Sequence, residues 1–201
     1  MTDDEARADI AAIREMLESG RSHAASCGPD IALWGIAVAI GYLGTYAFVR
    51  GGWSLSPNWL WAACIGLPWV YSLRGLWLRL AGRKKPERRS PIAIAQGKMW
   101  LGLGIFLTLL VAATMWTGDD RQGWLNAVVA GAMGSALFAT SWLTGLGWLR
   151  WIALAWWGGE ILVYALRHQP EALLVSAALM LLLLAAPGVV LARRRQRQLS
   201  A

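Results

Sequence analysis

Five long runs without a single charged residue constrain the fold of this sequence more than any other feature. A helix that crosses the roughly 30 Å hydrocarbon core of a bilayer needs about 20 mainly apolar residues, and charge-free runs of this length are typical of such helices. A sixth segment, 151–166, is apolar apart from Glu160. The five runs cover residues 31–49, 51–73, 99–118, 122–149 and 172–192.

The chain is therefore expected to be an all-α, polytopic membrane bundle with six transmembrane helices. Hydrophobic residues make up 57% and charged residues only 15%, whereas soluble domains carry about 25% charged residues. Residues 1–30 are predicted to form a cytoplasmic acidic amphipathic helix and linker, 31–192 the transmembrane domain, and 193–201 a basic cytoplasmic tail. The predicted spans lie near 31–49, 58–80, 92–116, 124–147, 150–167 and 171–192.

The positions of Lys and Arg predict the orientation. The segment 83–89 carries five positive charges and one negative charge, and the tail carries Arg193, Arg194, Arg195 and Arg197. Positive residues gather on the cytoplasmic side of membrane proteins. With an even number of spans, both termini are predicted to be cytoplasmic in a bacterial-type inner (plasma) membrane. The first thirty residues hold seven acidic and three basic residues, which argues against a cleavable signal peptide.

Tryptophan is abundant, with 14 residues in 201. Indole rings prefer the headgroup level of a bilayer, so most of them are predicted to form two belts at the span ends. Only Trp69, Trp156 and Trp157 fall near mid-depth. The predicted outer belt contains Trp53, Trp59, Trp61, Trp116 and Trp124, and the inner belt Trp34, Trp77, Trp100, Trp142, Trp148 and Trp151.

Residues 3–19 are predicted to form a short helix that ends at Gly20. Ile10, Ile13 and Leu17 share one face of it. Its polar side is acidic, whereas membrane-surface helices carry Lys and Arg there, so the membrane is a poor partner for it. Two interpretations remain. The helix packs loosely on the bundle, or its apolar face docks to something basic, either the chain's own segment 83–89 or a cytoplasmic protein.

Glu160 is the first candidate for chemistry inside the membrane. A carboxyl group at that depth is costly, so it is expected to face the bundle interior, pair with a cation or be protonated. Tyr164 lies one turn on and can hydrogen-bond to it. Arg74 is a candidate partner, although its guanidinium can also snorkel to the cytoplasm. The functional interpretation is a proton relay or ligand counter-ion; the structural one is a protonated, hydrogen-bonded side chain.

A ligand pocket is predicted around this carboxyl group. Pro68 is expected to kink the second span, which is a common way to widen a cavity. The pocket requires the second and fifth spans to be neighbours. Its candidate lining is Trp69, Tyr71, Arg74, Trp156, Glu160 and Tyr164.

Small residues recur every four positions in the fourth span, at Ala127, Gly131 and Ser135, with Ala130 and Gly134 alongside. Such spacing allows helices to approach closely. It predicts internal packing, and homodimerisation through this span is the alternative.

Catalytic and metal-binding patterns are not found. His23 and His168 are predicted on opposite sides of the membrane, and His23 with Cys27 makes too few ligands for a metal site. Neither a nucleophile elbow nor a phosphate-binding glycine loop is present. No cofactor or metal is therefore expected. Nucleic acid is not expected either, because the basic residues are explained by membrane topology.

These observations predict a non-enzymatic membrane protein that is sensing or regulatory, with a small amphiphilic or lipid ligand between its helices. The alternative is a small transporter or substrate-capture subunit in which Glu160 couples a proton or binds a cation. Transport predicts that Glu160→Gln abolishes uptake. Regulation predicts that deletion of residues 3–19 is the damaging change.

Overall fold

The computed structural model describes residues 3–54, 56–81, 90–117 and 124–200. Within these ranges the chain is helical and contains no strand. The basic segment 83–89, which was predicted as one docking partner of the amino-terminal helix, lies outside the described residues. The elements are α1 (Asp3–Ser26), α2 (Gly28–Val49), α3 (Pro57–Leu80), α4 (Pro91–Thr117), α5 (Trp124–Thr144), α6 (Trp148–Ala165), α7 (Glu171–Met180), the π-helical turn η1 (Leu181–Ala185) and α8 (Ala186–Ser200).

Each range predicted as a span is helical. Five of them differ from the observed helices by at most three residues, whereas the last continues as α8 to Ser200, through most of the predicted tail 193–201. Four helices are long and apolar enough to cross a membrane, which is compatible with an integral membrane protein. Helices α3 and α6 are not among the four. Each contains four tryptophans and two charged residues, Arg74 and Arg79 in α3 and Arg150 and Glu160 in α6. The four are Gly28–Val49, Pro91–Thr117, Trp124–Thr144 and Glu171–Arg197.

The amino-terminal helix is longer than predicted. Helix α1 does not end at Gly20 but continues to Ser26, and α2 begins two residues later at Gly28. Gly20 instead allows a close helix crossing, because a Cβ there would lie 3.0 Å from Cγ2 of Ile92 on α4. The prediction that this glycine stops the helix is therefore wrong.

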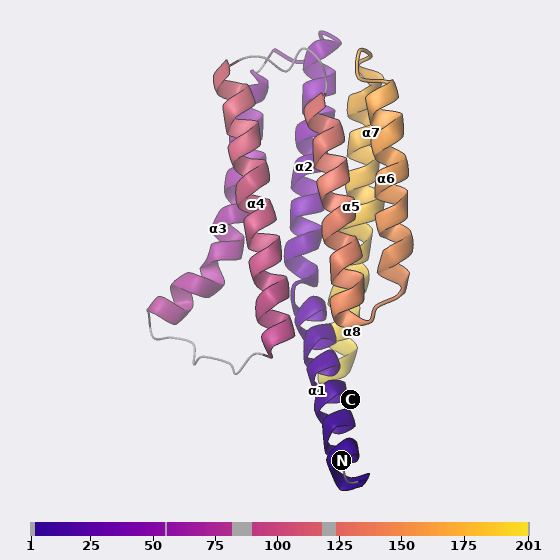
Figure 1. Ribbon diagram of the computed structural model, residues 1–201. Helices are drawn as coiled ribbons and strands as arrows, with labels where there is room; N and C mark the ends of the chain where they lie inside the picture. Colours follow the sequence, from indigo (N-terminus) through magenta and orange to yellow (C-terminus); the bar gives the residue numbers. More distant parts are fainter. Residues whose placement is uncertain (1–2, 55, 82–89, 118–123, 201) are drawn as a thin grey trace.

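Helix α2 occupies the centre of the bundle and contacts α3 on one side and α7, η1 and α8 on the other (Figure 1). Helices α5 and α6 form an antiparallel hairpin whose turn contains Gly145 at a φ of +65°. Helix α4 packs against α5, and α6 packs against α7. The amino and carboxyl termini lie at the same end of the bundle (Figure 1).

Small residues bring α2 almost into backbone contact with the last helix. A Cβ on Gly35 would lie 2.6 Å from the backbone nitrogen of Ala185, and a Cβ on Gly188 would lie 2.5 Å from that of Ala32. Close approach of this kind is how small residues support helix association in membranes. At the opposite end from the termini, Arg50 at the end of α2 forms a salt bridge with Glu171 at the start of α7.

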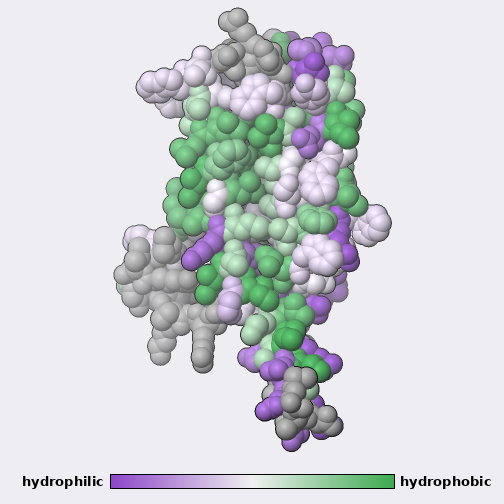
Figure 2. All heavy atoms as spheres, viewed as in Figure 1, coloured by the Kyte–Doolittle hydropathy of each residue, from purple (hydrophilic) through white to green (hydrophobic). Residues whose placement is uncertain are grey.

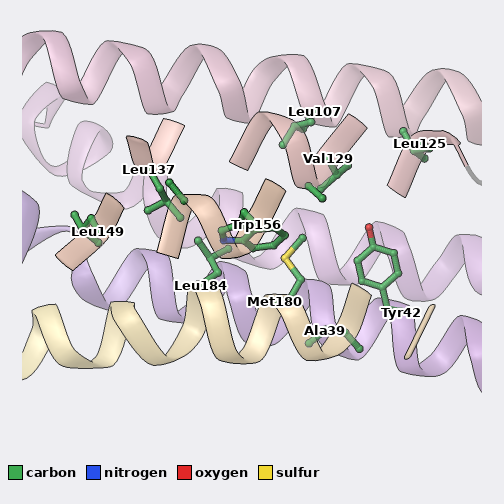
Figure 3. Packing of buried hydrophobic residues seen from close by; sticks show 13 residues of the cluster. Ala39, Tyr42, Leu107, Leu125, Val129, Leu137, Leu149, Trp156, Met180 and Leu184 are labelled. Atoms are coloured by element: carbon green, nitrogen blue, oxygen red, sulfur yellow. The ribbon is translucent and has the colours of Figure 1, made fainter. Parts of the chain in front are cut away.

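The core lies where α2, α5, α6 and α7 meet. Trp156 is 1% exposed and lies beside Met180 and Leu184 (Figure 3). The flank of the bundle carries many apolar side chains, while hydrophilic residues concentrate on the projecting end of α1 (Figure 2). Exposed apolar side chains such as Val70 and Ile161 are what a lipid-facing surface requires.

Six tryptophans join neighbouring helices by donating a hydrogen bond from the indole N–H. The predicted belts do not account for this role. Trp34, Trp61 and Trp100, assigned to the belts, point inward and donate to Ser72, Thr45 and Thr140. Buried indole N–H groups need an acceptor, and hydroxyl-bearing side chains on the adjacent helix supply it. Other predicted belt residues are exposed, namely Trp53, Trp59, Trp77, Trp116, Trp124, Trp142 and Trp151.

Candidate functional site

The structure does not bring the six predicted pocket residues together. Trp69, Tyr71 and Arg74 lie on α3, which packs against α2. The other three lie on α6, which packs against α5 and α7. Within the described residues α3 and α6 form no helix–helix interface, because α2 and α5 lie between them (Figure 1). The predicted lining is thus divided into two separate groups.

On α3, Trp69 is a structural link between three helices. Its N–H donates to the hydroxyl of Thr108 on α4 at 2.9 Å, and its ring meets that of Trp34 on α2 edge-on at 5.7 Å. Trp34 in turn donates to Ser72, whose hydroxyl donates to a carboxylate oxygen of Asp30 at 3.1 Å. Three hydrogen bonds and one edge-on ring contact therefore link α2, α3 and α4 in series.

Tyr71 and Arg74, the other two predicted residues on α3, are exposed. Pro68 lies inside the helix, and the end of α3 leans away from the bundle (Figure 1), as expected of a helix that contains proline. Arg74 has no hydrogen-bond or ion-pair partner among the described residues. The proposed pairing of Arg74 with Glu160 is not formed.

On α6, Trp156 hydrogen-bonds to the carbonyl group of Leu183, which lacks its usual backbone donor because of a proline four residues later. In an α-helix the oxygen of Leu183 would accept from the N–H of residue 187, but residue 187 is a proline and has none. The helix forms a π-helical turn at Leu181–Ala185. The N–H of Trp156 donates to the Leu183 oxygen at 3.1 Å. Trp156 is therefore a packing residue that repairs this irregular turn.

Glu160 lies in the groove between α5 and α6, directly over Gly131. A Cβ on Gly131 would lie 2.9 Å from Oε2 of Glu160, so the missing side chain makes the space that this carboxyl group occupies. Its side chain is half-buried, and among the described residues no hydrogen-bond donor or cation reaches it. Tyr164 is exposed and lies instead against the guanidinium of Arg167, 4.4 Å from the ring centre. The predicted Tyr164–Glu160 hydrogen bond is not formed.

Most of the small residues of α5 pack inside the chain, whereas Ser135 is exposed. Ala127, Ala130 and Gly134 are buried, and a Cβ on Gly134 would lie 2.6 Å from the indole of Trp157 on α6. The N–H of Trp157 donates to the oxygen of Gly131 at 3.4 Å. These contacts are those of internal packing, and homodimerisation stays a prediction.

The predicted docking face on α1 is open. Ile10 is 52% and Ile13 is 57% exposed, while Leu17 is half-buried. Met16 is also exposed and was not singled out from the sequence. No described element covers Ile10 and Ile13, and binding of a partner there stays a prediction.

The second half of α1 is anchored in the bundle. Ala24 and Ala25 are buried, and α1 contacts α4, α5 and α8. Arg21 donates from Nε to the carbonyl oxygen of Thr144 at 3.0 Å. This carbonyl belongs to the last residue of α5, where helix carbonyl groups lack partners and the dipole attracts a cation. Helix α1 thus joins an exposed arm to a fixed base.

Several of these features were missed from the sequence, although signals existed. Pro187 identifies Leu183 as a carbonyl in need of a donor. The small residues Gly28, Ala32, Gly35 and Ala39 of α2 recur every three or four positions and so share one face of the helix. Comparisons with protein-family models, with curated proteins and with solved structures found no match.

Proposed function

We propose that this is a non-enzymatic integral membrane protein of the sensing or regulatory class, with α1 as its cytoplasmic output arm. All six helices of the bundle are taken to span the membrane, and both termini to face the cytoplasm. The shared end of the two termini and the arginines that follow the last span support this orientation.

The observation that carries the proposal is the division of α1 into two halves. Its second half is buried against α4, α5 and α8, while its first half projects with Ile10 and Ile13 uncovered. A helix transmits motion along its axis because its backbone hydrogen bonds make it stiff. A ligand that favours one packing of α4 and α5 would therefore reposition the arm. Such a shift requires a differential affinity of the ligand for the two packings.

The position of α3 supports a small amphiphile or lipid as the ligand. Its main contacts are with α2, and Trp69 alone reaches from it to α4 by a side-chain hydrogen bond. A helix with so few partners is the element that an amphiphile can separate most easily, since little packing is lost. Trp69, together with the exposed Tyr71 and Arg74, would face such a ligand.

The experiment compares the transcript profile of cells that produce the wild-type protein with cells that produce single variants at equal membrane level. Ile13→Asp places a charge on the exposed apolar face of α1. Ala12→Asp introduces the same charge on the opposite side of that helix and is the matched control. We expect the wild-type and Ala12→Asp proteins to change the profile alike, and Ile13→Asp to abolish the change.

Transport is the second candidate, because Glu160 presents a carboxyl group without a protein partner among the described residues. Intramembrane carboxyl groups are typical of proton and cation pathways. Glu160→Gln enters the same comparison. A response that survives Ile13→Asp but is lost in Glu160→Gln would overturn the regulatory role of the arm and support transport.

A further inference from the structure

A small hollow lies at the turn between α5 and α6, at the end of the bundle that holds both termini. Its volume is about 130 Å³, several times the roughly 30 Å³ that one water molecule occupies in the liquid. It is lined by Ser141, Trp142, Gly145, Gly147 and Arg150. The hollow is separate from both halves of the predicted pocket and from the exposed face of α1.

Ser141 supplies a hydroxyl group that the protein itself does not use. The side chain is 2% exposed, and its Oγ has no hydrogen-bond partner among the described residues. Ser135 on the same helix and Ser176 on α7 instead donate to the carbonyl four residues earlier, which is the usual arrangement for serine in a helix. A buried polar group without a partner is costly. Ser141 lines the hollow while its Oγ is itself covered, so a ligand that enters the hollow and reaches this atom would satisfy it.

Arg150 supplies a cation at the rim. Its guanidinium lies 5.1 Å from the ring centre of Trp142 and donates to no described residue. Gly147 leaves room for it, because a Cβ there would lie 3.2 Å from one terminal nitrogen of Arg150. The stacked ring holds the planar guanidinium in place while its N–H groups stay available.

Two further features make the surroundings positive. The hollow lies between the amino-terminal end of α6, where the helix dipole favours an anion, and the last turn of α5, where the guanidinium of Arg21 binds the Thr144 carbonyl and offsets the opposite dipole. Arg21 lies on the other side of the turn, with a terminal nitrogen 3.1 Å from where a Cβ of Gly145 would be. Arg194 lies over the ring of Trp148 at 5.6 Å. Three guanidinium groups thus surround one short turn.

We propose that this hollow binds a phosphate group, with Ser141 and Arg150 as its direct ligands. A hydroxyl donor and a planar guanidinium are groups that recognise phosphate oxygens. The dipole at the start of α6 adds to the attraction, while the N–H groups of Leu149 and Arg150 are bonded to the carbonyl groups of Leu146 and Gly147. The exposed rings of Trp142 and Trp151 mark the headgroup level of a bilayer. The phosphate can belong to a lipid headgroup or be free in the cytoplasm, and the chemistry of the site is the same. The inference does not depend on the proposed role of α1.

The test is native mass spectrometry of the full chain in a phosphate-free maltoside detergent, titrated with phosphatidic acid, diacylglycerol and inorganic phosphate. Arg150→Gln removes the cation, and Ser141→Ala removes the hydroxyl. Gly147→Ala keeps both groups but displaces the guanidinium. Arg14→Gln removes an exposed arginine on the projecting half of α1, away from both candidate ligand sites, and is the matched control. Thermal unfolding of each variant shows that it is folded.

We expect phosphatidic acid to bind and diacylglycerol not to compete. Arg150→Gln should weaken binding about tenfold or more, the effect of one charge-assisted hydrogen bond, and Gly147→Ala should weaken it in the same direction. Competition by inorganic phosphate would identify a site for free phosphate as well, whereas its failure to compete would assign the site to lipid. Equal losses in Arg150→Gln and Arg14→Gln, or no loss in Arg150→Gln, would overturn the proposal.

Discussion

The indole N–H of Trp156 on α6 donates a hydrogen bond to the carbonyl oxygen of Leu183. It takes the place of the backbone N–H that Pro187 lacks. One residue interrupts the last helix and another, from a neighbouring helix, satisfies the backbone group that the interruption exposes. In a membrane there is no water to take this role, so the two residues act as a pair although 31 positions separate Trp156 from Pro187 in the sequence.

This pairing predicts the effect of Trp156→Phe. The ring is kept and the N–H donor is lost, so the Leu183 oxygen stays unpaired in an apolar core. The free energy of unfolding in detergent should fall by about 1 kcal/mol. Trp151→Phe is the control, since Trp151 is 74% exposed. Equal effects of the two variants would show that the hydrogen bond contributes nothing.

The close approach of α2 to the last helix predicts a large effect of one methyl group. In Gly35→Ala the new Cβ would meet backbone atoms of Ala185, which cannot rotate away. The helices must move apart, and unfolding in a detergent titration should become easier by about 2 kcal/mol. Gly66→Ala on α3 is the control, because a Cβ there meets nothing within 4 Å. It should be neutral or slightly stabilising, since alanine favours the helix. A neutral Gly35→Ala would contradict the observed packing.

The contact of Arg21 with the end of α5 predicts that Arg21→Gln loosens the base of α1. Hydrogen exchange of the amides around residues 20–26 should accelerate, with a loss of about 1 kcal/mol in local stability. Arg14→Gln changes the charge equally on the exposed half of α1 and should leave these amides unchanged. Identical exchange in the two variants would show that Arg21 does not hold the arm.

The surroundings of Glu160 predict the behaviour of Glu160→Gln. No cation lies within reach of the carboxyl group among the described residues, and glutamine has nearly the shape of a protonated glutamate. The variant should be at least as stable as the wild-type protein in thermal unfolding from about pH 5 to pH 9, because the replacement leaves no cation among the described residues without its partner. A large loss at neutral pH would instead identify an ionised, paired carboxylate.

The positions of the helices could be predicted from the sequence because they depend on local composition. Charge-free runs bounded by Arg50, Arg150 and Arg193 are sufficient to locate the helices to within a few residues. The arrangement of the helices could not be predicted, because all of them offer apolar faces to one another. The predicted pocket depended on such an arrangement, and α2 lies where the second and fifth spans were expected to meet.

The tryptophans show the same limit at the level of single residues. Trp61 and Trp59 are two positions apart near the start of α3, yet Trp61 donates to Thr45 and Trp59 is 75% exposed. Depth in the membrane is similar for both. Only the rotation of the helix decides which one meets a hydroxyl group, and that rotation is set by packing against α2.

The packing of α1 on α4, α5 and α8 also constrains the order in which the helices fold. Gly20 and Arg21 rest on α4 and α5, and the same helix contacts α8. All three of these helices emerge from the ribosome after α1. Helix α1 therefore reaches its final position only after α8 has been synthesised and packed. A chain in which α4, α5 or α8 is missing or misplaced lacks part of the surface on which α1 rests, so the docking of α1 depends on the correct placement of all three.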